Sequence, residues 1–282
     1  VTVGGSGTGT LSLSGTFTNI NTFLDTASNV QYTGASDASG NDATTLTVRA
    51  NDGDGSGNVD LGTVNVDITA VNDDPTLSGL PADVTVTEDT ASSVDLSAAN
   101  FGDVDSSSIT VTLTASAGTF STPASGAGAG AGVTATLVNS TTITLAGAPD
   151  DIDTYLDTAS NIQYTGASNT SGNDAATITV TANDGDGSGD VSLGTVNVDI
   201  TAVNDDPTIS GLATDVTVTE DTASDLDLSA SAFADVDSAG TVTVYLIAGA
   251  GTMTATSGGS VTVGGSGTGT LSLSGTFTNI NT

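Results

Sequence analysis

Apolar and polar residues alternate along several short segments of this chain. In Gly62–Ala70, the side chains of Val64, Val66 and Ile68 fall on one face of an extended strand and polar side chains fall on the other. The same alternation occurs in Asp83–Thr87, Ser93–Ser97, Ile109–Thr114, Gly132–Leu137, Thr141–Leu145 and Ala176–Ala182. Short β-branched strands with turn residues about every 8–12 positions predict antiparallel β-sandwiches, so the expected fold class is all-β.

Only one kind of segment has a helical pattern. Asp150–Ala159 places Ile152, Tyr155 and Leu156 at the i, i+3, i+4 spacing of a helix face, and its first aspartates precede them. Negative side chains at a helix N-terminus interact favourably with the helix dipole. We therefore expect a short helix here and in the equivalent segment Asn19–Ala27.

The sequence repeats itself at two distances. Residues 1–22 return unchanged as residues 261–282, and VNVDITAVNDDPT at Val64–Thr76 returns 132 positions later at Val196–Thr208. Self-similarity at a fixed period is typical of tandem-repeat proteins. Two related modules of about 130 residues therefore alternate. We expect the chain to be one period of a longer array.

The repeated NDDP sequence marks the module boundaries, because it follows the last alternating strand of one module and precedes the next module. The expected organisation has a complete module between two partial ones. Residues 1–71 are the C-terminal part of a module, 72–75 a linker, 76–203 a complete module, 204–207 a linker and 208–282 the N-terminal part of the next module. Each partial module lacks strands that its core needs.

One insertion distinguishes the complete module from its neighbours. The run SGAGAGAG at Ser125–Gly132 has no counterpart elsewhere in the chain. A silk-like sheet needs many such runs, because it is stabilised by stacking. A single short run predicts a flexible hairpin insertion instead.

The charge balance is strongly acidic, because 33 acidic residues stand against one base, Arg49, and the net charge is −32. Such a chain cannot neutralise nucleic-acid phosphates and is repelled by anionic membranes, so neither is an expected partner. The absence of cysteine excludes disulfides and thiolate metal sites. No run has the length of a membrane span or a signal peptide. Disorder is the alternative explanation of the acidity, but the chain is 36% hydrophobic and its apolar residues alternate regularly.

The acidic residues are almost all aspartates, with Glu88 and Glu220 as the exceptions. A surface that only needs to be soluble would mix Glu, Lys and Arg. Asp is the carboxylate that suits tight turns and the coordination of hard cations. Asp25 and Asp60 are expected to form turns only, whereas the clusters near the linkers predict calcium ligands.

Several motifs of the chain resemble cadherin repeats. In VNVDITAVNDDP a last strand runs into an Asn-Asp linker before proline, as at the end of a cadherin repeat. Glu88 in VTVTEDT resembles the cadherin first-strand Glu, and Asp103–Asp105 resembles the Asp-x-Asp loop. Glu220 and Asp235–Asp237 repeat both matches in the next module. The resemblance covers essentially the whole chain and looks most like the cadherin-like repeats of giant bacterial surface proteins.

The resemblance implies tandem antiparallel Greek-key β-sandwich modules of the cadherin/immunoglobulin-like type in an extended array, with Ca²⁺ at the module junctions. Calcium accepts about six to eight oxygen ligands in irregular geometry, so carboxylates from several loops can share one ion. At the first junction the implied ligands are Asp42, Asn72, Asp73, Asp74, Asp103, Asp105, Asp184 and Asp186. At the second junction they are Glu88, Asp174, Asn204, Asp205, Asp206, Asp235 and Asp237. Equivalent roles in their own modules fall to Asp52, Asp54 and Glu220.

The chain departs from the cadherin pattern at two points. The cadherin linker usually has an Asp two residues before its Asn, but Ala70 and Ala202 stand there. The family's Asp-Arg-Glu motif has no clear counterpart, and Asp42 and Asp174 are its substitutes. We therefore expect about one or two ions per junction rather than three.

The expected function is structural. The chain would be a repeat segment of a secreted bacterial fibre or giant cell-surface protein, stiffened by calcium, with neighbouring repeats of the same or an identical chain as its partners. An adhesive module for glycans or surfaces is the alternative, although it requires an exposed aromatic cluster and the chain has only four Tyr and six Phe. Ice binding is a third hypothesis, suggested by abundant Thr but without a regular Thr-x-Thr array. A carboxylate-pair glycosidase would lack His, Lys and Trp, so we expect no enzymatic activity and no catalytic residues.

Overall fold

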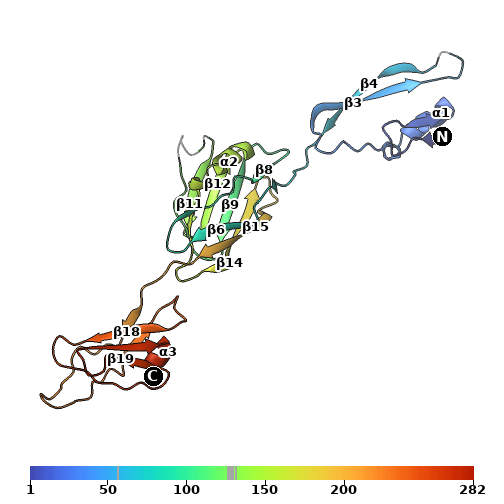
Figure 1. Ribbon diagram of the computed structural model, residues 1–282. Helices are drawn as coiled ribbons and strands as arrows, with labels where there is room; N and C mark the ends of the chain where they lie inside the picture. The colour runs from blue at the N-terminus through green and yellow to red at the C-terminus, as the bar shows by residue number, and fades with distance from the viewer. Residues whose placement is uncertain (56, 126–129, 131) are drawn as a thin grey trace. The chain divides into compact units, whose positions relative to one another are not determined.

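The computed structural model describes residues 1–55, 57–125, 130 and 132–282 (Figure 1). The chain forms two compact units, Val1–Asp73 and Asp74–Thr282. Both consist mainly of short β-strands in several sheets, with a few short helices. Among the described residues, no helix is long and apolar enough to cross a membrane. Most of the expected hairpin insertion at Ser125–Gly132 lies outside the described residues.

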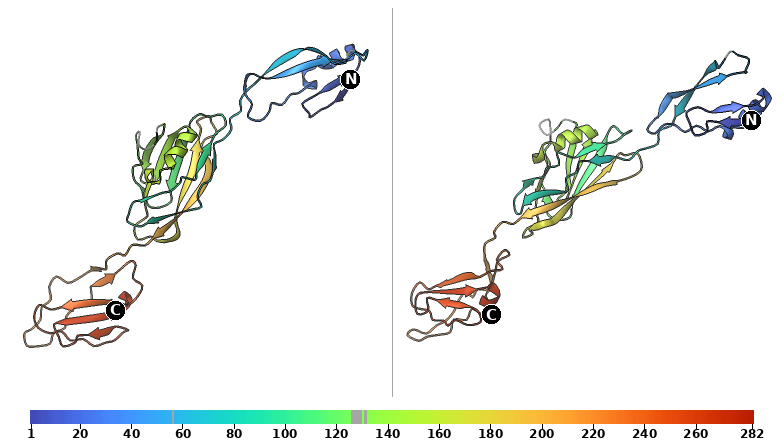
Figure 2. Two further views of the ribbon diagram at one scale, coloured as in Figure 1. Left: turned by 45° about the horizontal axis from the view of Figure 1, so that its top comes forward. Right: turned by 45° about the vertical axis from the view of Figure 1, so that its right-hand side comes forward.

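The first unit contains two separate antiparallel strand pairs. Its elements are β1 (Thr2–Gly4), β2 (Ser12–Ser14), α1 (Phe17–Leu24), the 3₁₀ turn η1 (Ala27–Asn29), β3 (Gly40–Ala50) and β4 (Val59–Ile68). β1 pairs with β2, and β3 pairs with β4 in a two-stranded hairpin (Figure 2). Helix α1 begins after Thr16, whose hydroxyl accepts a hydrogen bond from the N–H of Asn19 at 3.3 Å. No described residue of this unit is buried.

The second unit is built around a six-stranded sheet with the order β11-β12-β9-β14-β15-β6. The strands are β6 (Asp83–Thr87), β9 (Ile109–Ala115), β11 (Thr134–Asn139), β12 (Thr142–Gly147), β14 (Gly172–Asn183) and β15 (Val191–Thr201). All neighbours are antiparallel except β15 and β6, which run parallel. The strands predicted by alternation at Asp83–Thr87, Ile109–Thr114 and Ala176–Ala182 are confirmed.

Two smaller sheets and a helix contribute to the same core. β5 (Thr76–Ser78) pairs with β8 (Asn100–Gly102), and β13 (Gln163–Thr165) lies between β10 (Thr119–Phe120) and β7 (Ser92–Ser93). Helix α2 (Pro149–Leu156) contacts β8 and β12 (Figure 1). It ends at Leu156, earlier than the sequence predicted, and the 3₁₀ turn η2 (Ala159–Asn161) follows it.

The hydrophobic core of the second unit lies within residues 84–200. Tyr155 and Tyr164 are its largest fully buried side chains. Their hydroxyls donate hydrogen bonds to the carbonyls of Ala124 at 2.8 Å and Ala117 at 2.6 Å, respectively. Burial raises the pKa of Tyr155 to about 12, so this hydroxyl stays protonated and remains a donor. Burying each large apolar side chain stabilises the fold by roughly 1.5–3 kcal/mol, and these hydrogen bonds offset the cost of burying the hydroxyls.

Residues 204–282 form a smaller set of strands with little burial. The elements are β16 (Thr208–Ser210), β17 (Ala232–Ala234), β18 (Val242–Ile247), β19 (Thr262–Gly264), β20 (Thr270–Gly275) and α3 (Phe277–Ile280). β20 lies between β18 and β19, and β16 pairs with β17. Only Leu271 and Gly275 are buried in this part of the chain, so it has no extended core of its own.

The strand expected at Ser93–Ser97 is wrong beyond Ser93. The Asp95 carboxylate accepts hydrogen bonds from the hydroxyl of Ser97 at 2.7 Å and from its N–H at 3.0 Å, and these bonds fold the backbone into a turn. They also lower the pKa of Asp95, the hydroxyl bond more than the backbone bond. Val94 and Leu96 are nevertheless buried, so the alternation correctly predicted which side chains face the core.

Candidate metal centre

The candidate centre is built on Glu88, which directly follows β6. Its N–H donates a hydrogen bond to the carbonyl of Thr201 at 3.1 Å. Its Oε1 atom accepts a hydrogen bond from the N–H of Val203 at 2.7 Å. These two bonds hold the side chain against the end of β15, where only 1% of Glu88 is exposed. The carboxylate is therefore both buried and fixed in position.

Asp205 and Asp237 bring two more carboxylates to Glu88. One oxygen of each of the three residues lies within 4.8 Å of the others. The Asp237 carboxylate accepts a hydrogen bond of 2.6 Å from the N–H of Asp205. Asp237 is held in turn by Asp235, whose Oδ1 atom accepts hydrogen bonds of 2.9 Å from the N–H groups of Asp237 and Ser238. The linker and the loop after β17 thus meet the end of β6.

Two oxygens of this cluster are buried without a hydrogen-bond partner. They are Oε2 of Glu88 and Oδ2 of Asp205. A buried polar atom without a partner costs about 1–3 kcal/mol, and more when the group is charged. Native proteins rarely leave such atoms unpaired, so these two oxygens are available to a hydrogen-bond donor or a cation.

The electrostatics of the cluster also favour a cation. Desolvation is the largest cause that raises the pKa of Asp205, followed by repulsion from Asp237, Asp89, Glu88 and Asp235. The only ion pair among the described residues joins Arg49 and Asp60, in the first unit. Hence no basic side chain neutralises the cluster, and a bound cation would convert the mutual repulsion into coordination.

The donor set fits a hard divalent cation. All three donors are carboxylate oxygens, which are ligands of calcium and magnesium. Three carboxylates from separate segments form an irregular arrangement, which calcium tolerates better than magnesium does. Glu88, Asp205 and Asp237 would hold the ion, and the ion would supply positive charge without any redox chemistry.

The loop of Asp103 has a similar internal arrangement. Its Oδ1 atom accepts hydrogen bonds from the N–H groups of Asp105 at 3.1 Å and Ser106 at 2.7 Å, while its Oδ2 atom is buried without a partner. The hydroxyl of Ser106 donates to Asp186 at 3.0 Å, and the N–H of Asp186 donates to Asp184 at 2.9 Å. The structure therefore brings the loops of Asp103 and Asp184 together.

Asp174 lies in a different cluster from the one expected for it. Its carboxylate groups with those of Asp83 and Asp199, again with ligand atoms within 4.8 Å of one another. The N–H of Asp174 donates to Asp199 at 2.9 Å, and Asp42 makes the equivalent bond to Asp67 at 2.8 Å. Both Asp42 and Asp174 have positive φ angles, of 54° and 53°. Sequence reasoning missed Asp83 and Asp199, although Asp67 and Asp199 occupy the same place in the repeated VNVDIT.

The other expected ligands lie mostly on exposed segments. Glu220 is exposed, unlike its equivalent Glu88. The N–H of Asp54 donates to Asp52 at 3.0 Å, in an exposed turn of the first unit. The linker residues Asn72, Asp74, Asn204 and Asp206 are exposed, and Asp73 is half-buried.

Comparison of the chain with protein-family models, with curated proteins and with solved structures finds no match.

Proposed function

We propose that this chain is a structural repeat segment of an extracellular fibre or giant cell-surface protein. Its modules would be tandem Greek-key β-sandwiches of the cadherin/immunoglobulin-like type, and calcium would stiffen the junctions between them. One observation carries the proposal: the buried Glu88 has an unpartnered oxygen beside Asp205 and Asp237. Glu88 directly follows β6, Asp205 lies in the linker, and Asp237 lies in the loop after β17.

This arrangement explains how an ion would stiffen the chain. Glu88 is fixed to residues 76–203 by its hydrogen bonds to Thr201 and Val203. Asp205 belongs to the linker, and Asp237 follows β17 in residues 208–282. An ion bound to all three would join these segments. At the Kd of about 10⁻⁴–10⁻³ M typical of extracellular calcium modules, roughly 10 mM calcium would stabilise the junction by about 1.4–2.7 kcal/mol.

The sequence repeats support a structural role rather than a catalytic one. An array multiplies length and stiffness, because each module contacts mainly its neighbours. The identical sequence VNVDITAVNDDPT gives both linker regions the same acidic residues. The β14–β15 pair and the β3–β4 pair also share the same register, including irregularities at the same places. Equivalent modules and equivalent junctions are what a rod requires.

A calcium titration of the whole chain by calorimetry tests the proposal. We expect Glu88→Gln to remove one binding event or to weaken it by about tenfold or more, because the variant loses a charged ligand but keeps the shape of the side chain. Glu220→Gln is the matched control, because the same local sequence surrounds this residue but its side chain is exposed. Indistinguishable titrations of Glu88→Gln and the unaltered chain would contradict the proposal.

A further inference from the structure

One pentapeptide of the chain adopts two different structures. The sequence DVTVT forms strand β6 at Asp83–Thr87 but forms no strand at residues 215–219. β6 pairs in parallel with β15, and its Val86 is 1% exposed. The equivalent Val218 is 58% exposed. Since the sequences are identical, residues 215–219 lack a partner strand rather than the propensity to form one.

Strand β18 also lacks a partner strand, on one of its two edges. It is the equivalent of β9, because β20 pairs with β18 in the register in which β12 pairs with β9. Thus Val242 lies opposite Gly275, and Ile109 lies opposite Gly147. β9 has β12 on one side and β14 on the other, whereas β18 has only β20. One edge of β18 is therefore open.

The hairpin β3–β4 lacks the partner strand that its equivalent has. It is the equivalent of β14–β15, but it pairs with no further strand among the described residues of the first unit. Leu46 and Val64 are 52% and 53% exposed, whereas the equivalent Ile178 and Val196 are 0% exposed. The hairpin therefore presents an apolar face that the complete module buries entirely.

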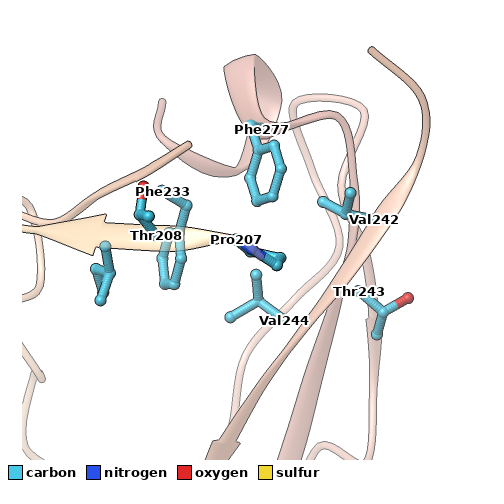
Figure 3. Close-up of a pocket in the computed structure, with 8 residues that line it drawn as sticks. Pro207, Thr208, Phe233, Val242, Thr243, Val244 and Phe277 are labelled. Atoms are coloured by element: carbon cyan, nitrogen blue, oxygen red, sulfur yellow. The ribbon is translucent and has the colours of Figure 1, made fainter. Parts of the chain in front are cut away.

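An apolar hollow beside β18 marks the part of a core that residues 204–282 leave unfilled. Its lining includes Phe233, Val242, Val244 and Phe277, whose side chains converge in Figure 3. In the complete module, the residues equivalent to Phe233, Val242 and Val244 are buried in one continuous core. The hollow therefore lies where residues 76–203 have buried core side chains.

We propose that the β3–β4 hairpin of one copy of this chain completes the open sheet of residues 208–282 of a second copy. The resulting order would be β19-β20-β18-β3-β4 followed by residues 215–219, as in β11-β12-β9-β14-β15-β6. Residues 261–282 repeat residues 1–22, so β19 and β20 keep their places and only the hairpin is added. We expect this hairpin to be the occupant because it is the equivalent of β14–β15. Those two strands fill the corresponding place in the complete module.

The complete module also fixes the register of the added strand. β14 pairs with β9 so that Thr179 lies opposite Thr114 and Thr181 lies opposite Thr112. Transferred to the two copies, this register places Thr47 opposite Ile247 and Arg49 opposite Tyr245. Parallel pairing of β15 with β6 likewise places Ile68 opposite Val218.

The pair of Arg49 and Tyr245 supports this register independently. Both residues replace a threonine of the complete module, and the register brings the two replacements together on the outer face of the sheet. Arg49 is also the only base of the chain, and it already pairs with Asp60 on β4. A guanidinium beside a tyrosine ring forms a cation–π contact, which two threonines cannot form. The contact would favour this docking over the pairing of other modules.

Single-cysteine chains test the docking directly, because the chain has no cysteine of its own. Opposed residues of an antiparallel pair have Cα atoms about 4.5–5.5 Å apart, which a disulfide spans. Mixing Thr47→Cys chains with Ile247→Cys chains under mild oxidation should therefore give a 47–247 disulfide between copies. Thr243→Cys is the matched control, because it lies four residues away on the same strand, about 13 Å along it. Equal yields at positions 247 and 243 would overturn the proposed register.

Sedimentation of the unaltered chain tests the association itself. We expect end-to-end oligomers that grow with protein concentration at 0.5 M salt, where the repulsion between copies of net charge −32 is screened. Arg49→Thr and Tyr245→Thr should each weaken association by about two- to fivefold, and the double variant should lose little more, because the two residues share one contact. Thr181→Ala, the equivalent position in the complete module, should leave association unchanged. A monomer at every concentration would overturn the proposal and would assign the open sheet to a covalently joined neighbour instead.

Discussion

The N–H of Val203 donates a 2.7 Å hydrogen bond to Oε1 of Glu88, across 115 residues of sequence. Glu220 has the same neighbours in sequence, VTVTEDTAS, but it is exposed. The difference lies in β15, which runs beside β6 and delivers Val203 to Glu88. Of these two glutamates, only the one whose strand pairs with β15 is therefore buried. The pairing of β15 with β6 thus positions one carboxylate of the candidate metal centre.

The raised pKa of Asp205 predicts a pH dependence in the absence of calcium. Between the ordinary pKa of 3.8 and the raised pKa, the native state binds more protons than the unfolded state. Protonation of Asp205 therefore stabilises the native state fully below pH 3.8, and this stabilisation is lost as the pH rises through the raised pKa. In a chelator, the chain should therefore be more resistant to cleavage in the 204–207 linker near pH 4 than near pH 7. An acid-tolerant protease can report this difference.

The variant Asp205→Asn separates this effect from general acid stabilisation. It removes the titrating group, so the linker should become less dependent on pH in chelator. It should also lose most of the protection that calcium gives at pH 7, because the amide carries no charge. Full calcium protection of Asp205→Asn would exclude Asp205 as a ligand.

Substitutions at equivalent positions of the two hairpins should change the free energy of unfolding by very different amounts. Ile178→Ala should destabilise the second unit by about 2–5 kcal/mol, because the side chain is fully buried in the central strand β14. Leu46→Ala should change the stability of a dilute chain by less than about 0.5 kcal/mol, because the equivalent side chain is half exposed. Chemical denaturation at low protein concentration measures both. A large effect of Leu46→Ala under these conditions would mean that the first unit has a core that its burial pattern does not show.

The Asp103 loop predicts a difference between two substitutions at one position. Asp103→Ala should cost about 1–3 kcal/mol, because it removes the acceptor of the hydrogen bonds from Asp105 and Ser106. Asp103→Asn should retain most of this stability, because its amide oxygen can accept the same bonds. Thermal unfolding of both variants in chelator provides the comparison, and equal destabilisation would show that these hydrogen bonds do not hold the loop.

The sequence predicts the fold correctly for strands in which one face is buried, because apolar and polar residues alternate along them. Strands β6, β9 and β14 follow the pattern of their apolar residues, since a slip of one position would turn every core side chain outward. The turn at Asp95 was not predictable from that pattern, because local bonds to Ser97 replace the ladder without changing which residues are buried. The two structures of DVTVT show the same limit, since strand pairing depends on a distant partner.

The sequence predicts most of the acidic residues of the candidate site, but not all of the groups in which their carboxylates lie together. Glu88, Asp205 and Asp237 could be expected together, because each belongs to a recognisable motif near the linker. The grouping of Asp174 with Asp199 depends on the register and the irregular backbone of β14, which spacing along the sequence does not specify. The burial of Glu88 likewise follows from the pairing of β6 with β15, which joins distant parts of the chain.

The most direct test of calcium stiffening measures the spread of distances across the Asp205 junction. Spin labels at Ser140→Cys and Thr256→Cys would report on residues 76–203 and 208–282, since both positions are exposed and the chain contains no other cysteine. The distance distribution between labels in one molecule is measured by pulsed electron resonance, with unlabelled chain in excess. We expect a narrow distribution in 10 mM calcium and a broad one in chelator, with Glu88→Gln broad in both. Distributions of equal width with and without calcium would contradict calcium stiffening.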